Sequence, residues 1–86
     1  MKILYKAITA DTQVTTQSCY FVGASSGFEV EHLKIYDEAS SSATAAQMVC
    51  DLGAEDCFTI PMPGVKCDNG LYAEIDHGTA VVYYYY

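Results

Sequence analysis

The sequence predicts a small antiparallel β-sandwich of about seven to eight strands, in a single domain that covers residues 1–86. Turn-forming residues recur about every 8 to 12 residues, which is typical of short strands joined by tight turns. Near the C-terminus, Leu71, Ala73 and Ile75 alternate with Tyr72 and polar residues, which is the period of a strand with one buried face. The hydrophobic fraction of 51% is ample for one core and is dispersed along the chain, so no membrane-spanning helix is expected.

The first half of the chain predicts three strands. Residues 2–9 have the short apolar stretch of a first strand and lack the pattern of a secretory signal. Residues 17–23 end at the glycine-rich turn 23–27, and residues 28–36 end at the turn 37–42. Within the third strand the apolar residues change from one face to the other, so we expect a bulge near Glu31 or His32.

The second half predicts five more strands. Residues 45–52 are ambiguous, because their apolar residues also fit a helical stripe with Ser42 as N-cap and Gly53 just past the end. The strand that follows is stopped by two prolines, which cannot donate a hydrogen bond to a ladder, and is therefore an edge or a crossover. Hairpin turn residues separate the remaining strands. The expected ranges are 45–52, 57–60, 65–67, 70–76 and 79–85.

The C-terminal strand ends in four consecutive tyrosines, and it has apolar or aromatic residues at every position from 81 to 86. Both faces of such a strand need cover, and we expect a core on one face and a partner on the other. Tyr84 shares its face with Ala80 and Val82, whereas Tyr83 and Tyr85 share theirs with Val81. The pattern leaves open which set faces the core. The candidate interface therefore includes Tyr83, Tyr84, Tyr85 and Tyr86.

The charge pattern argues against nucleic acid as a partner. The chain has four lysines, no arginine, eleven acidic residues and a formal net charge of −7. Binding to phosphates needs clustered basic residues, which this chain cannot supply. Lys2 and Lys6 form the one locally basic segment, on the same strand face as Leu4, and we add them to the candidate interface as rim residues.

No catalytic residue, cofactor or metal site is predicted. His32 and His77 lack the partner motifs of acid–base catalysis, and His77 is expected to be an exposed turn residue. The acidic turns 68–70 and 76–78 could lend oxygens to calcium, but they match hairpin turns better, and the twelve-residue calcium-loop pattern is missing.

The four cysteines contain no C-x-x-C pair that would indicate a zinc ribbon or a redox motif. Cys50 and Cys67 share their strand faces with apolar neighbours, so we expect free buried thiols and no requirement for a disulfide. One or two disulfides are the alternative. The three possible ways of pairing Cys19, Cys50, Cys57 and Cys67 are not distinguished by the sequence.

The order of these features resembles small virion structural proteins of tailed phages. A strand ending in Tyr36-Asp37 is followed by a loop of small residues and a strand to Leu52. An aromatic and proline-containing segment at 58–63 then precedes Gly70-Leu71-Tyr72, which opens the last hairpin. The resemblance covers about the last 60 residues. It implies a compact β-sandwich, and on this ground we favour a strand over a helix at 45–52.

The resemblance also implies a role without enzymatic activity. We expect a cement or decoration protein that stabilises the capsid lattice, assembled in the host cytoplasm and localised in the virion. Its partners would be the major capsid protein or another virion protein and further copies of itself, with neither nucleic acid nor membrane involved. A reducing cytosol would favour free thiols. Two alternatives are open: a tail, neck, fibre or host-surface and carbohydrate-binding module, and an acidic inhibitor of a host enzyme.

Overall fold

A computed structural model describes residues 2–27, 29–39 and 48–86, and within them all regular structure is β. The strands form two antiparallel sheets, which confirms the predicted all-β fold and agrees with a small sandwich. The strands are β1 (Leu4–Ile8), β2 (Thr12–Thr15), β3 (Cys19–Ser26), β4 (Leu33–Tyr36), β5 (Met48–Leu52), β6 (Cys57–Thr59), β7 (Val65–Cys67), β8 (Leu71–Ile75) and β9 (Ala80–Tyr85).

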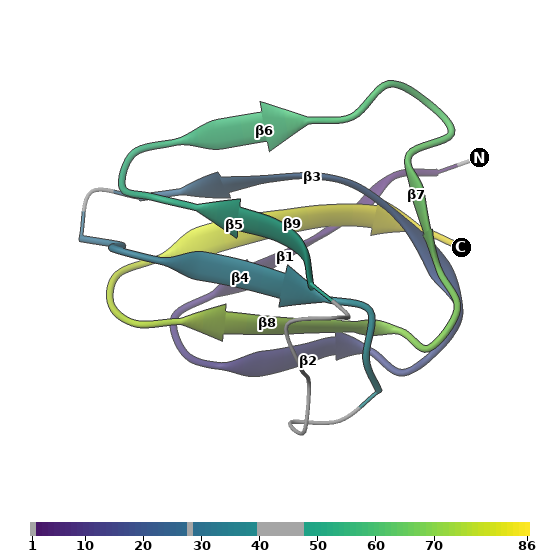
Figure 1. The fold of residues 1–86 in the computed structure, drawn as a ribbon, viewed down its shortest axis with the longest axis horizontal. Helices are drawn as coiled ribbons and strands as arrows, with labels where there is room; N and C mark the ends of the chain where they lie inside the picture. Colours follow the sequence, from purple (N-terminus) through teal and green to yellow (C-terminus); the bar gives the residue numbers. More distant parts are fainter. Residues whose placement is uncertain (1, 28, 40–47) are drawn as a thin grey trace.

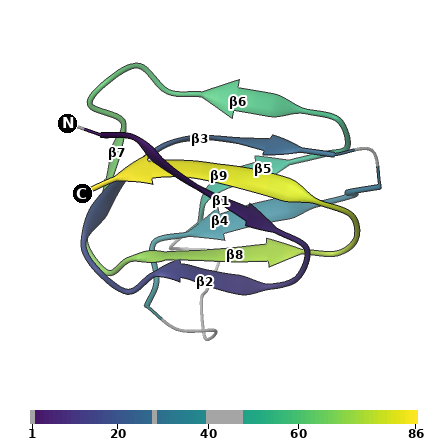
Figure 2. The same cartoon turned by 180° about the vertical axis from the view of Figure 1, so that it is seen from behind.

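The five-stranded sheet has the order β1-β9-β3-β6, and β7 pairs with β3 beside β6. The four-stranded sheet has the order β2-β8-β4-β5 and lies in front of the other sheet in Figure 1. Seen from behind, β9 and β1 lie at the front (Figure 2), and the start of β1 pairs with the end of β9, where Leu4 lies opposite Tyr84. The C-terminal strand thus lies in the interior of its sheet, hydrogen-bonded to β1 on one side and to β3 on the other.

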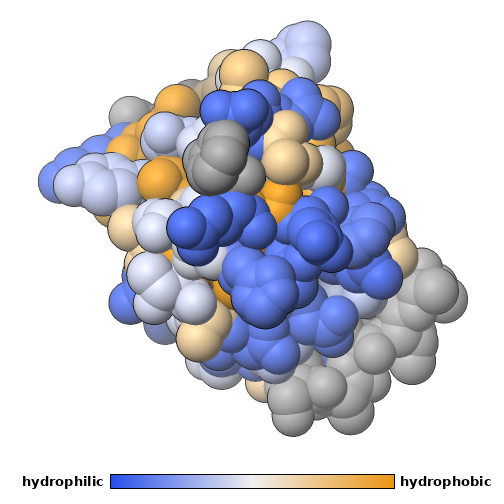
Figure 3. Space-filling view, turned by 90° about the vertical axis from the view of Figure 1, so that its left-hand side faces the viewer, coloured by the Kyte–Doolittle hydropathy of each residue, from blue (hydrophilic) through white to orange (hydrophobic). Residues whose placement is uncertain are grey.

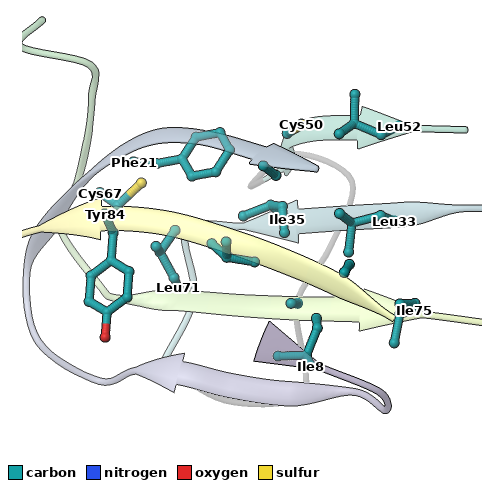
Figure 4. Packing of buried hydrophobic residues seen from close by; sticks show 14 of the residues in the cluster. Ile8, Phe21, Leu33, Ile35, Cys50, Leu52, Cys67, Leu71, Ile75 and Tyr84 are labelled. Carbon is teal, nitrogen blue, oxygen red and sulfur yellow. The ribbon is translucent and has the colours of Figure 1, made fainter. Parts of the chain in front are cut away.

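The hydrophobic core lies between the two sheets, because alternate residues of each strand point to the same side (Figure 4). In β8, Leu71, Ala73 and Ile75 enter the core as the alternation predicts. The other large side chains of the core come from strands of both sheets. The largest fully buried side chains are Phe21, Leu33, Ile35, Leu71, Val30, Val82, Cys19 and Cys67.

The sequence did not predict strand β2, because the expected ranges 2–9 and 17–23 leave residues 10–16 outside any strand. Its residues are polar or small, Thr-Gln-Val-Thr, and lack a clear alternation. The strand forms because it pairs with one edge of β8, with a register shift between Gln13 and Thr15. With β2 the described residues contain nine strands, one more than the eight ranges predicted.

The predicted strand 28–36 is wrong in its first half, because β4 begins only at Leu33. The backbone N–H groups of Glu31 and His32 donate to the Asp76 carboxylate at 3.0 and 3.1 Å, rather than to a neighbouring strand. The expected bulge near these residues is therefore a turn capped by Asp76. Val30 is nevertheless fully buried, which explains why the sequence has an apolar residue there. Residue 28 lies outside the described residues.

The ambiguous segment is a strand where the structure describes it. β5 pairs with β4 and contributes Cys50 and Leu52 to the core. The rest of the possible helix, residues 42–47, lies outside the described residues. The other predicted strands are correct to within three residues at each end, and β7 matches its predicted range. In the part of the chain that the structure describes, no helix is long and apolar enough to cross a membrane.

Candidate interaction surface

The structure decides which tyrosines face the core. Leu4 lies opposite Tyr84, and Val82 lies opposite Lys6 and Ala24, so the side of β9 that carries Val82 and Tyr84 faces inward. Tyr84 is 8% exposed and belongs to the core cluster (Figure 4). The other side of β9, with Val81, Tyr83 and Tyr85, forms part of the outer face of the five-stranded sheet.

Besides Tyr84, two more of the four tyrosines find their partners within the chain. Tyr85 stacks on Tyr20 with ring centroids 4.9 Å apart, and its hydroxyl donates to the carbonyl oxygen of Pro63 at 2.7 Å. Tyr86 is 57% exposed, but its hydroxyl lies 2.8 Å from that of Thr15. Its ring meets Tyr84 edge-on at 5.8 Å. The tail is therefore held against the domain, and its members do not form one exposed surface.

Tyr83 is the tail residue that remains available on the outer face. It is 36% exposed and lies opposite Tyr5, which is 72% exposed. A groove of about 440 Å³ opens beside Tyr83. Large apolar side chains at its walls are half exposed, among them Ile3 at 50% and Met62 at 47%. The groove is lined by Ile3, Val22, Ala24, Ser25, Cys57, Phe58, Thr59, Ile60, Met62 and Tyr83.

One wall of the groove is the segment between β6 and β7, which the two prolines remove from the sheet. It is held by two hydrogen bonds to neighbouring strands: Ile60 N–H donates to Val22 O at 2.9 Å, and Pro63 O accepts from Tyr85. Gly64 packs so closely on Phe21 that only a residue without a side chain fits there. Met62 thus stands on a fixed turn, and the groove is preformed in the folded chain.

The predicted lysines do not join Tyr83 on this face. Lys6 lies opposite Val82, whose side chain is in the core, so Lys6 projects from the opposite side of β1 to Tyr5. Its side chain is exposed at the edge of the sheet, where a charge discourages pairing with another strand. Lys2 is exposed before β1 begins. The sequence alone did not identify Tyr5, Met62 and Phe58 as surface residues. Their apolar side chains could have suggested it, because the C-terminal strand has apolar residues on both of its faces.

A second hollow, of about 280 Å³, lies at the end of the sandwich where β1 turns into β2 and β8 into β9. Figure 3 shows hydrophilic side chains gathered over this end. Two of its carboxylates already bind backbone groups: Asp11 accepts from Ile75 N–H at 2.9 Å, and Asp76 caps the 31–32 turn. His32 lies 3.8 Å from Asp51, but both side chains are well exposed, so this pair contributes little. The carboxylates at this hollow are thus accounted for by their hydrogen bonds in the turns, and they do not indicate a catalytic or binding site.

The Asp76 cap leads to a testable prediction about how the stability of the fold changes as the pH falls. Desolvation raises the pKa of Asp76, but hydrogen bonds from the backbone N–H groups of His32, Glu31, His77 and Asp76 itself together lower it more, so the pKa lies below its ordinary value of 3.8. A lowered pKa stabilises the fold above that value, and the contribution is lost as pH falls through the folded-state pKa. We expect Asp76→Asn to destabilise the protein at neutral pH and to differ less from the parent below about pH 3.

The measurement is the urea midpoint of both proteins between about pH 7 and pH 2.5. Glu29→Gln removes the same charge from an exposed carboxylate that caps no turn, and is the control. A gap between Asp76→Asn and the parent that stays constant over the whole range would contradict the proposed cap.

The cysteines are free, and three of the four are buried. Cys50 and Cys67 lie in the core as predicted, whereas Cys57 is exposed. Burial raises the pKa of the Cys50 thiol to about 11, helped by the nearby Asp51 carboxylate, so this thiol is protonated and inert at neutral pH. The described residues contain no group of three or more His, Cys, Asp or Glu side chains placed to hold a metal ion.

Comparison with known proteins adds no further information. No protein-family model matches the sequence, and no curated protein or solved structure matches it significantly. The resemblance to phage virion proteins therefore stays a hypothesis.

Proposed function

We propose that this chain is a non-enzymatic structural protein that works by association through the outer face of its five-stranded sheet. The observation that carries the proposal is the preformed apolar groove beside Tyr83, flanked by Tyr5, on a domain of only 86 residues. Exposed apolar patches of this kind mark interaction sites on small soluble domains. Tyrosine is among the residues that contribute most to such interfaces, because it buries a large rigid surface and keeps a polar end.

The partner we propose is a phage capsid lattice, with this chain as the decoration protein. This step rests on the resemblance of the last 60 residues to small virion proteins. Two physical features suit the role. The net charge of −7 keeps free copies apart in solution, and the groove needs no rearrangement before it binds. In the particle, neighbouring copies would add contacts to one another as a homo-oligomer.

The test is co-sedimentation of the purified protein with capsids assembled without it. We expect Tyr83→Ala to weaken binding by about 30-fold or more, as for an aromatic residue at the centre of an interface. Tyr86→Ala is the matched control, since it removes a tyrosine from the same tail but outside the groove. A parent protein that stays monomeric and ignores capsids would refute the role, and equal binding by both variants would exclude the groove.

The copy number per particle separates the alternatives. A lattice protein is present in hundreds of copies, whereas a tail, neck or fibre component is present in a few to tens. In the latter case the exposed rings of Tyr5 and Tyr83 would serve as a stacking platform for a host-surface sugar or peptide. An inhibitor of a host enzyme would be absent from purified particles. Quantitative mass spectrometry of the particles measures this number directly.

A further inference from the structure

Two of the buried cysteines lie directly opposite each other in the five-stranded sheet. Cys19 begins β3 and Cys67 ends β7, and the antiparallel register pairs them. Directly opposed residues in an antiparallel pair have Cα atoms about 4.5 or 5.5 Å apart, and both values lie within the range that a disulfide spans. Both side chains point into the core, where each is fully buried (Figure 4 shows Cys67). The register therefore places the two cysteines at a backbone separation that a disulfide can span.

The Cys67 thiol donates a hydrogen bond to the carbonyl oxygen of Val65 at 3.7 Å. The neighbouring Cys67 side chain lowers the pKa of Cys19, whereas the Cys19 side chain and burial raise the pKa of Cys67. The other two cysteines are placed differently: Cys50 lies in β5 of the opposite sheet, and Cys57 is opposite Ser25. Among the three pairings that the sequence left open, the structure favours one bond, between Cys19 and Cys67.

We propose that Cys19 and Cys67 form a reversible cross-strand dithiol, which closes to a disulfide when the chain meets an oxidant such as glutathione disulfide. Both thiols are fully buried, so the exchange takes place when the short strand β7 opens transiently. One cysteine thiolate then attacks the glutathione disulfide, and the first glutathione leaves as a thiolate that takes up a proton. The second cysteine then attacks the sulfur of the mixed disulfide and releases the second glutathione. Two protein thiols are oxidised to one disulfide, and one glutathione disulfide is reduced to two glutathiones.

Closing the bond would link a short strand covalently to the interior strand β3. β7 has three residues and pairs with β3 beside β6. It follows directly on the turn that carries Met62 and Pro63, so a covalent link to β3 restrains the wall of the groove. The reduced chain folds without the link, and the oxidised chain is held more tightly. This inference does not rest on the proposed capsid role.

The experiment is a thiol map of the purified native protein, incubated with reduced and oxidised glutathione until its thiol content is constant. The remaining thiols are blocked by alkylation, and peptides are identified by mass spectrometry without reduction. We expect a linked pair of peptides that contain Cys19 and Cys67. The melting temperature of the oxidised protein should exceed that of the reduced protein by about 10 °C, and dithiothreitol should reverse the increase.

A variant with Cys50→Ala and Cys57→Ala keeps the pair and removes the competing thiols, so it should show the same link and the same increase in melting temperature. Adding Cys67→Ala to it removes the pair and should abolish both. The proposal is overturned if the oxidised parent links other cysteines, carries only glutathione adducts, or leaves Cys19 and Cys67 open to alkylation in the unfolded protein after oxidation. The parent protein alone decides this, even where a variant fails to fold.

Discussion

Replacing Tyr84 by alanine is expected to lower the free energy of unfolding by about 3–5 kcal/mol, the usual cost of removing a large buried aromatic side chain. Tyr84 is 8% exposed, faces the core from an interior strand, and meets the ring of Tyr86 edge-on. Small domains have a total stability of only about 5–15 kcal/mol, so this loss threatens folding itself. Urea unfolding followed by circular dichroism measures it.

Tyr83→Ala is the matched comparison, because the two tyrosines are adjacent in β9 and point to opposite faces. We expect it to change stability by less than about 1 kcal/mol, since Tyr83 lines an open groove. Its effect should instead be found in partner binding. Equal losses of stability in the two variants would show that the outer face is packed as tightly as the core, and the interface proposal would then lose its main support.

Gly64→Ala is expected to destabilise the protein by about 1–3 kcal/mol from backbone conformation alone, with a further loss from steric conflict. Gly64 has φ of +85°, which side chains rarely adopt. A Cβ atom there would lie 2.5 Å from the carbonyl oxygen of Phe21 and 2.8 Å from Cγ1 of Val22. The turn that carries Met62 would have to move away from β3, so the groove should be lost together with the stability.

The control is Gly53→Ala, where an added Cβ would meet only the carbonyl oxygen of Glu31, at 4.0 Å. We expect it to change the melting temperature by no more than a few degrees. Thermal melting and capsid co-sedimentation of both variants form the test. If Gly64→Ala melted and bound like the parent, the turn would be free to shift, and the groove could not be regarded as preformed.

The sequence determined the parts of this fold that depend on local pattern. Strand β8 was predicted from three alternating apolar residues, and β7 from a short stretch between two turns. Both follow because side chains alternate across a strand whatever its neighbours are. The same alternation divided the tail into two sets, with Tyr84 in one and Tyr83 in the other. The low number of basic residues also argued against nucleic acid without any structure.

Tertiary structure alone decided the rest, because those features depend on pairing between segments far apart in the chain. β2 has no periodic signal and exists only as a partner of β8, and the strand expected from residue 28 is cut short by a carboxylate 44 to 45 residues away. Which tyrosines face the core depends on the position of β9 between β1 and β3. The opposed cysteines and the groove likewise arise from register, which no local pattern specifies.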